Sequence, residues 1–208
     1  MKITVLGGTG RTGRLLTSEL LADGHDVTML VRDASKSAAF ADRATIVTGD
    51  IRDDAAVSRA VTGADAVASA LGPVGTDVTL LRDSAALVTA VMARAHVSRY
   101  VGISVAGLTL PGDRKRGRDQ VISWLLNTLG GELAKDKIAE HAIWDRSGLD
   151  WTLVRVPRLV DGPLSAVDHD AHVSGRRTTL RRSNLAQFIA ETVRSGGYSR
   201  EAPFVSDR

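Results

Sequence analysis

Four glycines stand at positions 7, 8, 10 and 13, directly after the apolar run KITVL and before leucines at helical spacing. They form both G-x-x-G-x-x-G and G-x-G-x-x-G. Glycines at these spacings let the chain turn, let the backbone approach a pyrophosphate closely, and let a helix pack tightly on a strand. The free amide groups at the start of that helix attract anions. Because a second apolar run completes a strand-helix-strand unit of about 30 residues, the pattern predicts a dinucleotide site rather than a packing turn alone.

The residues after the second apolar run indicate which dinucleotide fits. In MLVRDASK, Arg32 comes first and Asp33 follows it. An arginine at this place accommodates the extra phosphate of NADP, whereas an acidic residue binds the ribose hydroxyls of NAD. Arg11 and Lys36 could assist in holding the phosphate. Arg32 could instead be an exposed charge at the entry of a helix, with Asp33 in the NAD role, but the order of the two residues favours NADP(H).

Other residue types that carry chemistry are absent or isolated. The chain has no cysteine, which excludes disulfides and thiolate nucleophiles, and no G-x-S-x-G motif supports a serine hydrolase. The stretch DHDAH at 168–172 superficially suggests metal ligands, but no further cluster supports it, so we expect a polar loop and no metal. The arginine-rich stretches 113–119 and 174–184 lack interleaved aromatic residues, which predicts solvated loops rather than a nucleic-acid surface.

Short apolar runs alternate with helix-like stretches over the first two thirds of the chain. The runs are rich in valine and isoleucine and predict strands buried on both faces at 2–7, 26–31, 44–49, 64–71, 99–104 and 150–156. Leucine, valine and alanine at helical spacing predict helices at 11–24, 53–63 and 79–97. This alternation is typical of βαβ units. We therefore expect an α/β fold, a doubly wound Rossmann-type parallel sheet with helices on both faces.

The pattern loosens after residue 104. We expect a loop over 105–119, a helical region over 120–146 interrupted by glycines, and an irregular segment at 159–180 with one short strand. Residues 105–130 and 157–182 are the expected substrate-site loops of a small irregular C-terminal region. Residues 183–197 predict a last helix, with Ser183 as the candidate N-cap.

The whole chain predicts one domain, residues 1–208, because no repeat or linker divides it. No apolar stretch of about 18 residues predicts a membrane span, and the N-terminus begins with a strand pattern instead of a basic and apolar leader. We therefore expect a cytoplasmic protein without a membrane partner. Helices around 79–95 and 120–146 could form a dimer face, but nothing in their pattern requires one, so a monomer and a homodimer both stay open.

The motifs GGTGRTG, VTMLVRD, VTGDIRD, SGLDWTLVRVPRL and SNLAQFIAETV resemble the atypical short-chain dehydrogenase/reductase superfamily. The likeness is greatest to the NAD(P)H-binding branch that includes biliverdin reductase B, a flavin reductase, and NmrA-like proteins. It runs through nearly the full chain, and it does not specify a substrate.

The resemblance implies a role for each matching position. The residues implied to line the pyrophosphate are Gly7, Thr9, Gly10, Arg11, Thr12 and Gly13. Arg32 would bind the 2′-phosphate, and Asp50 and Ile51 would contact the adenine. Those implied to border the nicotinamide and its ribose are Ala70, Leu71, Gly72, Ser104 and Pro157.

The chain departs from the superfamily at two places. Ordinary members use a tyrosine four residues before a lysine for proton transfer, but here Leu133 stands four residues before Lys137. In the flavin reductase a histidine follows the proline after the sixth strand, whereas Arg158 stands here and could hold an anionic substrate. Trp124 could border the substrate pocket.

These observations predict an NADPH-dependent reductase without the Tyr-Lys pair, with Ser104 orienting the substrate or the nicotinamide. Hydride transfer to a small-molecule acceptor such as a flavin or quinone suits such a site, because the cofactor carries the chemistry. The alternative is a non-catalytic redox sensor that binds NADP(H), of the NmrA-like type. An epimerase or dehydratase is a weaker alternative, because 208 residues leave little length for a separate substrate domain.

Overall fold

The computed structural model describes residues 1–72, 77, 79–115 and 131–208, with side chains from residue 135 onward in the last range. Trp124, the helical region expected at 120–130 and part of the loop expected at 105–130 lie outside the described residues. Among the described helices, none combines the length and the apolar character that crossing a bilayer requires.

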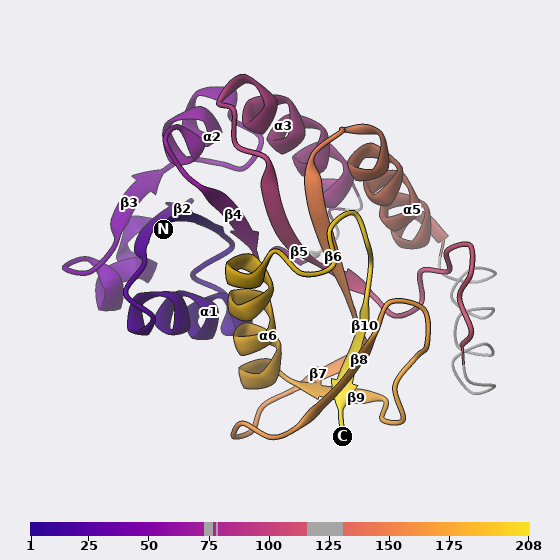
Figure 1. Cartoon of the computed structure of the whole chain (residues 1–208). Coiled ribbons are helices and arrows are strands. Elements are labelled where there is room, and N and C mark those ends of the chain that lie inside the picture. The colour runs from indigo at the N-terminus through magenta and orange to yellow at the C-terminus, as the bar shows by residue number, and fades with distance from the viewer. Residues whose placement is uncertain (73–76, 78, 116–130) are drawn as a thin grey trace.

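The core of the fold is an eight-stranded sheet (Figure 1). Its strand order is β3-β2-β1-β4-β5-β6-β10-β8, with a separate pair of strands formed by β7 and β9. The strands predicted from the apolar runs are β1 (Lys2–Leu6), β2 (Asp26–Val31), β3 (Thr45–Thr48), β4 (Ala66–Ser69), β5 (Arg99–Val105) and β6 (Asp150–Val156). They are all parallel, and β10 (Phe204–Asp207) extends the parallel set beside β6.

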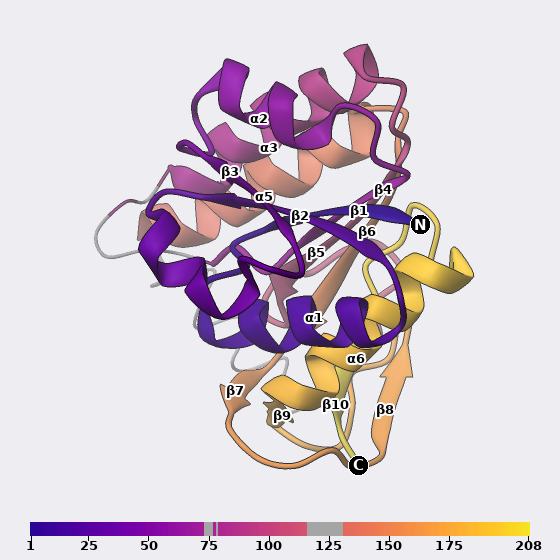
Figure 2. The same ribbon diagram turned by 90° about the vertical axis from the view of Figure 1, so that its left-hand side faces the viewer.

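Helices cover both faces of the sheet, which confirms the doubly wound α/β prediction (Figure 2). One face carries α1 (Arg11–Ala22) and α6 (Arg182–Ser195), together with the short 3-10 helix η1 (Ala34–Phe40) after β2. The other face carries α2 (Asp54–Val61), α3 (Leu80–Arg94) and α5 (Gly131–Arg146). Figure 2 shows α1 and α6 below the sheet and α2, α3 and α5 above it.

Side-chain alternation along the strands divides the core into two clusters. On β1, Val5 packs in the cluster under α1 and α6, whereas its neighbour Leu6 packs in the cluster under α2, α3 and α5. On β5, Val101 and Tyr100 divide in the same way. Strands buried on both faces need continuous apolar runs, and for that reason the sequence predicted β2 and β6 with their full bounds.

The C-terminal third has more strands than expected. The segment 157–182 contains β7 (Arg158–Val160), β8 (Val167–Asp170) and β9 (Thr179–Arg181) instead of one short strand. The strand β10 was not predicted at all. Strands of three or four residues carry too little pattern to be seen alone, and here they are fixed by pairing: β7 with β9, and β10 with β6 and β8.

The predicted N-cap of the last helix is wrong. Helix α6 begins at Arg182, and its N-cap residue Arg181 makes no side-chain capping hydrogen bond. The hydroxyl of Ser183 lies inside the first turn and donates to the carbonyl of Gly162. The helix ends at Gly196 in the left-handed conformation, as glycines after a helix commonly do.

A buried arginine fixes the described part of the loop after β5. Arg155 on β6 forms a bidentate ion pair with Asp113, at 2.5 and 2.9 Å, and both side chains are almost fully buried. Its remaining donors bond the carbonyls of Leu108, Ala171 and Ala202, and its guanidinium lies 3.7 Å from the ring centroid of Phe204. Every guanidinium donor is therefore satisfied, and one side chain joins four segments of the chain.

We expect Asp113→Ala to lower the free energy of unfolding by about 3–5 kcal/mol, because it leaves the Arg155 charge buried without a counterion. Urea unfolding measures the change. The matched control is Asp54→Ala, which removes an exposed ion pair with Arg94 and should cost less than about 1 kcal/mol. Equal losses in the two variants would contradict this account of the loop.

Candidate functional site

The candidate site lies at the carboxyl ends of β1 and β4, next to each other in the sheet. After β1 the chain enters α1 on one face, and α3, which comes after β4, covers the other. Such a reversal leaves a crevice at the strand ends, where ligands bind in open α/β sheets. Two cavities open there, of about 260 and 420 Å³. They adjoin, because both are lined by Gly10, Ala70, Leu71 and Gly72.

The turn between β1 and α1 depends on three glycines. Gly7 has the left-handed φ of +72°, and its carbonyl accepts a hydrogen bond of 3.1 Å from the amide of Gly10. A Cβ atom on Gly13 would lie 2.1 Å from that same carbonyl oxygen, so only glycine lets α1 pack this close. No side chain caps the first turn of α1. A tight glycine turn with an uncapped helix start fits a pyrophosphate.

The first cavity combines an apolar floor with one cation at its end. The residues that line it include Gly7, Thr9, Gly10, Leu30, Arg32, Asp50, Ile51 and Leu80. Arg32 follows β2 directly, and it forms no ion pair with a described residue. The site residues expected for the adenine and the 2′-phosphate thus line the same cavity.

The side chain of Asp33 caps η1 and does not line the cavity. Its carboxylate accepts hydrogen bonds from the amide and the hydroxyl of Ser35, at 3.0 and 2.6 Å, and thereby caps η1. These hydrogen bonds lower the pKa of Asp33, the hydroxyl of Ser35 being the larger cause. Asp33 does not line either cavity, whereas Arg32 does.

Arg14 was not singled out from the sequence, yet it joins the glycine loop to η1 beside the first cavity. Its guanidinium donates to the carbonyl of Thr9 at 3.0 Å and to the carbonyl of Lys36 at 2.7 Å. The glycine loop and η1 are therefore held at a fixed separation. Lys36 contributes this carbonyl, and its side chain is not part of the cavity lining.

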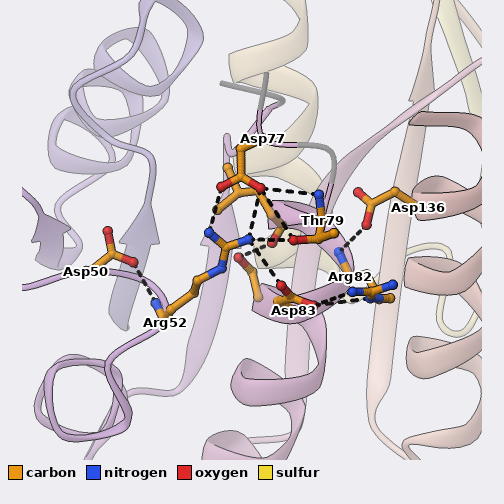
Figure 3. A network of polar contacts seen from close by, with 9 residues as sticks. Asp50, Arg52, Asp77, Thr79, Arg82, Asp83 and Asp136 are labelled. Atoms are coloured by element: carbon orange, nitrogen blue, oxygen red, sulfur yellow. Dashed lines mark hydrogen bonds and ion pairs between the residues drawn. The ribbon is translucent and has the colours of Figure 1, made fainter. Parts of the chain in front are cut away.

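The opposite wall is held by a polar network around Arg52 (Figure 3). The Arg52 guanidinium forms a bidentate ion pair with Asp77, at 2.6 and 3.0 Å, and also bonds Thr79 and Asp83. The Arg52 guanidinium is the main cause that lowers the pKa of Asp77 to about 2. Since the backbone amide of Arg52 donates to Asp50, the network ties the cavity wall to the start of α3.

The same network reaches α5 through a buried carboxylate. Asp136 accepts a 3.1 Å hydrogen bond from the amide of Arg82 in the first turn of α3, and Figure 3 shows the two residues facing each other across the helices. The next residue, Lys137, lines the second cavity. The wall of the first cavity is thus connected to the second cavity through the start of α3, its hydrogen bond to Asp136, and the adjacent Lys137.

Ser104 and Lys137 are two of the four buried polar residues that line the second cavity; Thr12 and Arg182 are the others. Ser104 is 1% exposed, and its hydroxyl has no hydrogen-bond partner among the described residues. The ammonium of Lys137 lies 2.8 Å from a carboxylate oxygen of Glu140 and 3.3 Å from the carbonyl of Ile103. Burial raises the pKa of Glu140, and the Lys137 charge opposes that rise. Because it lines the cavity, the Ser104 hydroxyl is free to bond a ligand group there.

Both tyrosines of the chain are described, and neither lines the second cavity. Tyr100 is buried in the core, where its ring stacks on Trp144 with centroids 3.7 Å apart. Burial raises the pKa of its hydroxyl. The hydroxyl of Tyr198 lies 2.6 Å from His169, at the far edge of the sheet.

The structure does not bring Arg158 into the site. Side chains alternate along β7, so Pro157 and Leu159 line the second cavity while Arg158 is exposed and lines neither cavity. The cavity takes a different arginine, Arg182 at the start of α6. The sequence gives only a weak signal for it, because Arg182 is one of four arginines between 176 and 182.

The comparisons with known proteins agree with this geometry. The profile of a family described as NAD(P)H-binding matches residues 7–195. The uncharacterized protein Rv2047c of Mycobacterium tuberculosis is 38% identical over 101 residues, 49% of this chain and 12% of that protein. An isoflavone reductase homologue of maize (Zea mays) is 35% identical over 48% of this chain and 33% of its own length. The chain thus matches only a small part of these relatives.

Solved structures share the fold over almost the whole chain. ChuY, an anaerobilin reductase of Escherichia coli O157:H7, has a TM-score of 0.81 at 19% identity, covering 100% of this chain and 97% of that one. A short-chain dehydrogenase/reductase of Veillonella parvula, solved in complex with NADP, has a TM-score of 0.80 at 19% identity, covering 99% and 94%. At such identities the likeness shows the fold alone. The family match over residues 7–195 shows more: the chain belongs to the NAD(P)H-binding family.

Proposed function

We propose that the protein is an NADPH-dependent reductase that transfers hydride to a flavin, a quinone or a similar conjugated acceptor. The observation that carries the proposal is the pair of adjoining cavities. One is lined by Arg32 and the other contains the buried hydroxyl of Ser104, and neither side chain has a partner among the described residues. An elongated dinucleotide that spans both would have its phosphate-bearing ribose at one end and its reactive ring at the other.

The position of each lining residue suggests which part of the cofactor it would contact. The glycine loop and the uncapped start of α1 would hold the pyrophosphate, and Ile51 would contact the adenine beside Asp50. Arg32 would bind the 2′-phosphate. The residues that would surround the nicotinamide and its ribose are Ala70, Leu71, Gly72, Ser104 and Pro157. When bound, the cofactor supplies a hydride.

The described lining of the second cavity offers no tyrosine that could donate the proton of the reaction. Both tyrosines lie away from the second cavity, and the Lys137 charge is already paired with Glu140. Arg11, which lines the same cavity, has a side chain that is 75% exposed, so water reaches the site. Conjugated acceptors such as flavins and quinones accept hydride and take their proton from solvent. The geometry therefore favours them over simple carbonyl compounds.

A non-catalytic NADP(H) sensor of the NmrA-like type is the second candidate. The same observation favours it, since a protein that only binds the cofactor needs no proton donor. The two candidates differ in turnover. The decisive assay follows NADPH oxidation with FMN, riboflavin and simple quinones, beside binding titrations of all four nicotinamide cofactors. Oxidation above the rate without protein supports the reductase, whereas tight binding without oxidation overturns it and supports the sensor.

We expect Arg32→Gln to weaken NADPH binding about 10- to 100-fold, because a charge-assisted hydrogen bond to phosphate contributes about 1.5–3 kcal/mol. NADH, which lacks that phosphate, should be bound with nearly unchanged affinity. Titration of both cofactors measures the difference. Arg43→Gln, an exposed arginine outside the first cavity, is the matched control. An equal loss for NADH and NADPH would contradict the assignment of Arg32.

Two glycine substitutions separate packing from binding. In Gly13→Ala the new Cβ would meet the Gly7 carbonyl oxygen at 2.1 Å, so we expect the free energy of unfolding to fall by about 1–3 kcal/mol without cofactor. In Gly10→Ala the same oxygen lies 3.3 Å away. This variant should lose less stability than Gly13→Ala and bind NADPH more weakly, because the methyl group fills the approach to the pyrophosphate. Unchanged NADPH binding by Gly10→Ala would argue against the loop as the pyrophosphate site.

Ser104→Ala should lower kcat/KM for the acceptor while the protein keeps its stability. The buried hydroxyl has no partner to lose among the described residues, so its removal exposes no unsatisfied group. Steady-state kinetics and thermal unfolding test the two halves of this prediction. A destabilised variant with normal kinetics would show that Ser104 acts only in packing.

A further inference from the structure

Three cations line the second cavity: Arg11, Lys137 and Arg182. None of the described residues lining it is acidic. Two carboxylates form ion pairs with these cations. Glu140 neutralises Lys137 at 2.8 Å, whereas Asp161 serves both arginines, at 2.7 Å from Arg182 and 4.0 Å from Arg11. Lys137 thus has a carboxylate of its own, whereas the two arginines share a single one.

Arg182 is a buried cation whose hydrogen bonding is incomplete. Its side chain is 9% exposed, yet among the described residues its guanidinium makes a single hydrogen bond, to Asp161. Arg155 in the same protein shows the usual pattern, with all its donors satisfied. The other guanidinium nitrogens of Arg182 are not among the enclosed atoms that lack a partner, so they stay accessible and can donate to a ligand in the cavity.

The carboxylate that now bonds Arg182 can be replaced. Asp161 is 73% exposed, so releasing it to water costs little. Asp161 also bridges the first residues of two helices, Arg11 of α1 and Arg182 of α6. Two helix starts therefore converge at this point, and each adds a partial positive charge to that of its arginine. Since Arg11 is a residue implied to line the pyrophosphate, Arg182 is the guanidinium that remains for a second anion.

The position of Arg182 distinguishes its anion from the pyrophosphate. Arg182 follows β9 directly, and it lines the cavity together with Pro157 and Leu159, which also come from the C-terminal third of the chain. The pyrophosphate would lie against the glycine loop at the start of α1. A second anionic group at Arg182 would therefore belong to the other molecule in the cavity, the hydride acceptor.

We propose that the acceptor carries a phosphate or carboxylate group, which binds Arg182 in the second cavity and displaces Asp161. The proposal rests on the reductase function proposed above, and it specifies the substrate class of that site. Arginine suits this role because its planar fork binds an oxyanion through two parallel hydrogen bonds.

FMN and riboflavin test the proposal, because they share one ring system and differ in a phosphate. Binding is measured by flavin fluorescence with NADP+ present, and kcat/KM is measured with NADPH. The wild type should prefer FMN, and Arg182→Gln should reduce the FMN-to-riboflavin preference about tenfold, the loss expected for one charge-assisted contact. Arg182→Lys should retain part of the preference. Arg181→Gln is the matched control, since that side chain bonds Ser165 and does not line the cavity.

A second variant keeps the test decisive if Arg182→Gln does not fold. Asp161 is exposed, so Asp161→Asn should fold normally, and removing the competing carboxylate should tighten FMN binding severalfold without changing riboflavin binding. Equal binding of the two flavins by the wild type, or no change in preference in either variant, would overturn the proposal. So would a loss of NADPH affinity in Arg182→Gln as large as the loss for FMN, because the arginine would then serve the cofactor.

The readouts also separate this proposal from the reductase function. If both flavins are reduced with equal efficiency, the reductase stands and the anion site fails. If no acceptor is reduced but FMN binds more tightly than riboflavin through Arg182, the anion site stands and the reductase fails.

Discussion

The close approach of α1 to the end of β1 is the constraint on which the rest of the site depends. A Cβ atom on Gly13 would lie 2.1 Å from the carbonyl oxygen of Gly7, so the helix can begin directly beyond the strand only because that atom is missing. The left-handed φ of Gly7 turns the chain in the same few residues. This contact places the uncapped helix start over the crevice between β1 and β4, and both cavities extend from it.

Around this fixed point, exposed arginine side chains hold the walls at set distances. Arg14 spans from Thr9 to Lys36, and Arg52 joins the wall at Asp50 to the start of α3. Exposed ion pairs contribute little stability one at a time. Their effect here is geometric, because each side chain bonds backbone or side-chain groups of two segments far apart in the sequence. Preorganised walls of this kind lower the entropy lost when a ligand binds.

The sequence predicted those parts of the fold whose pattern is local. The strand β6 is a continuous apolar run and the glycine turn is a local motif, so both could be placed in advance. The short strands β7 and β10 could not, because their positions depend on partners distant in the chain. The same limit explains why Arg158 was expected in the site and Arg182 was not. Alternation along β7 turns Arg158 outward, and only the folded chain brings the start of α6 to the second cavity.

Three buried cations, Arg155, Lys137 and Arg182, differ in how completely the protein satisfies their hydrogen-bond donors. Arg155 has every donor satisfied and fixes a loop, so replacing its partner breaks the structure rather than the chemistry. Lys137 is held by one carboxylate and one carbonyl, which leaves its charge neutralised beside the cavity. Arg182 has one exposed partner and donors to spare. A guanidinium satisfied by its own fold has nothing left for a ligand, whereas an incompletely bonded one at a cavity gains most when an anion arrives. The degree of internal satisfaction, more than the charge itself, therefore separates the structural arginine from the one available for recognition.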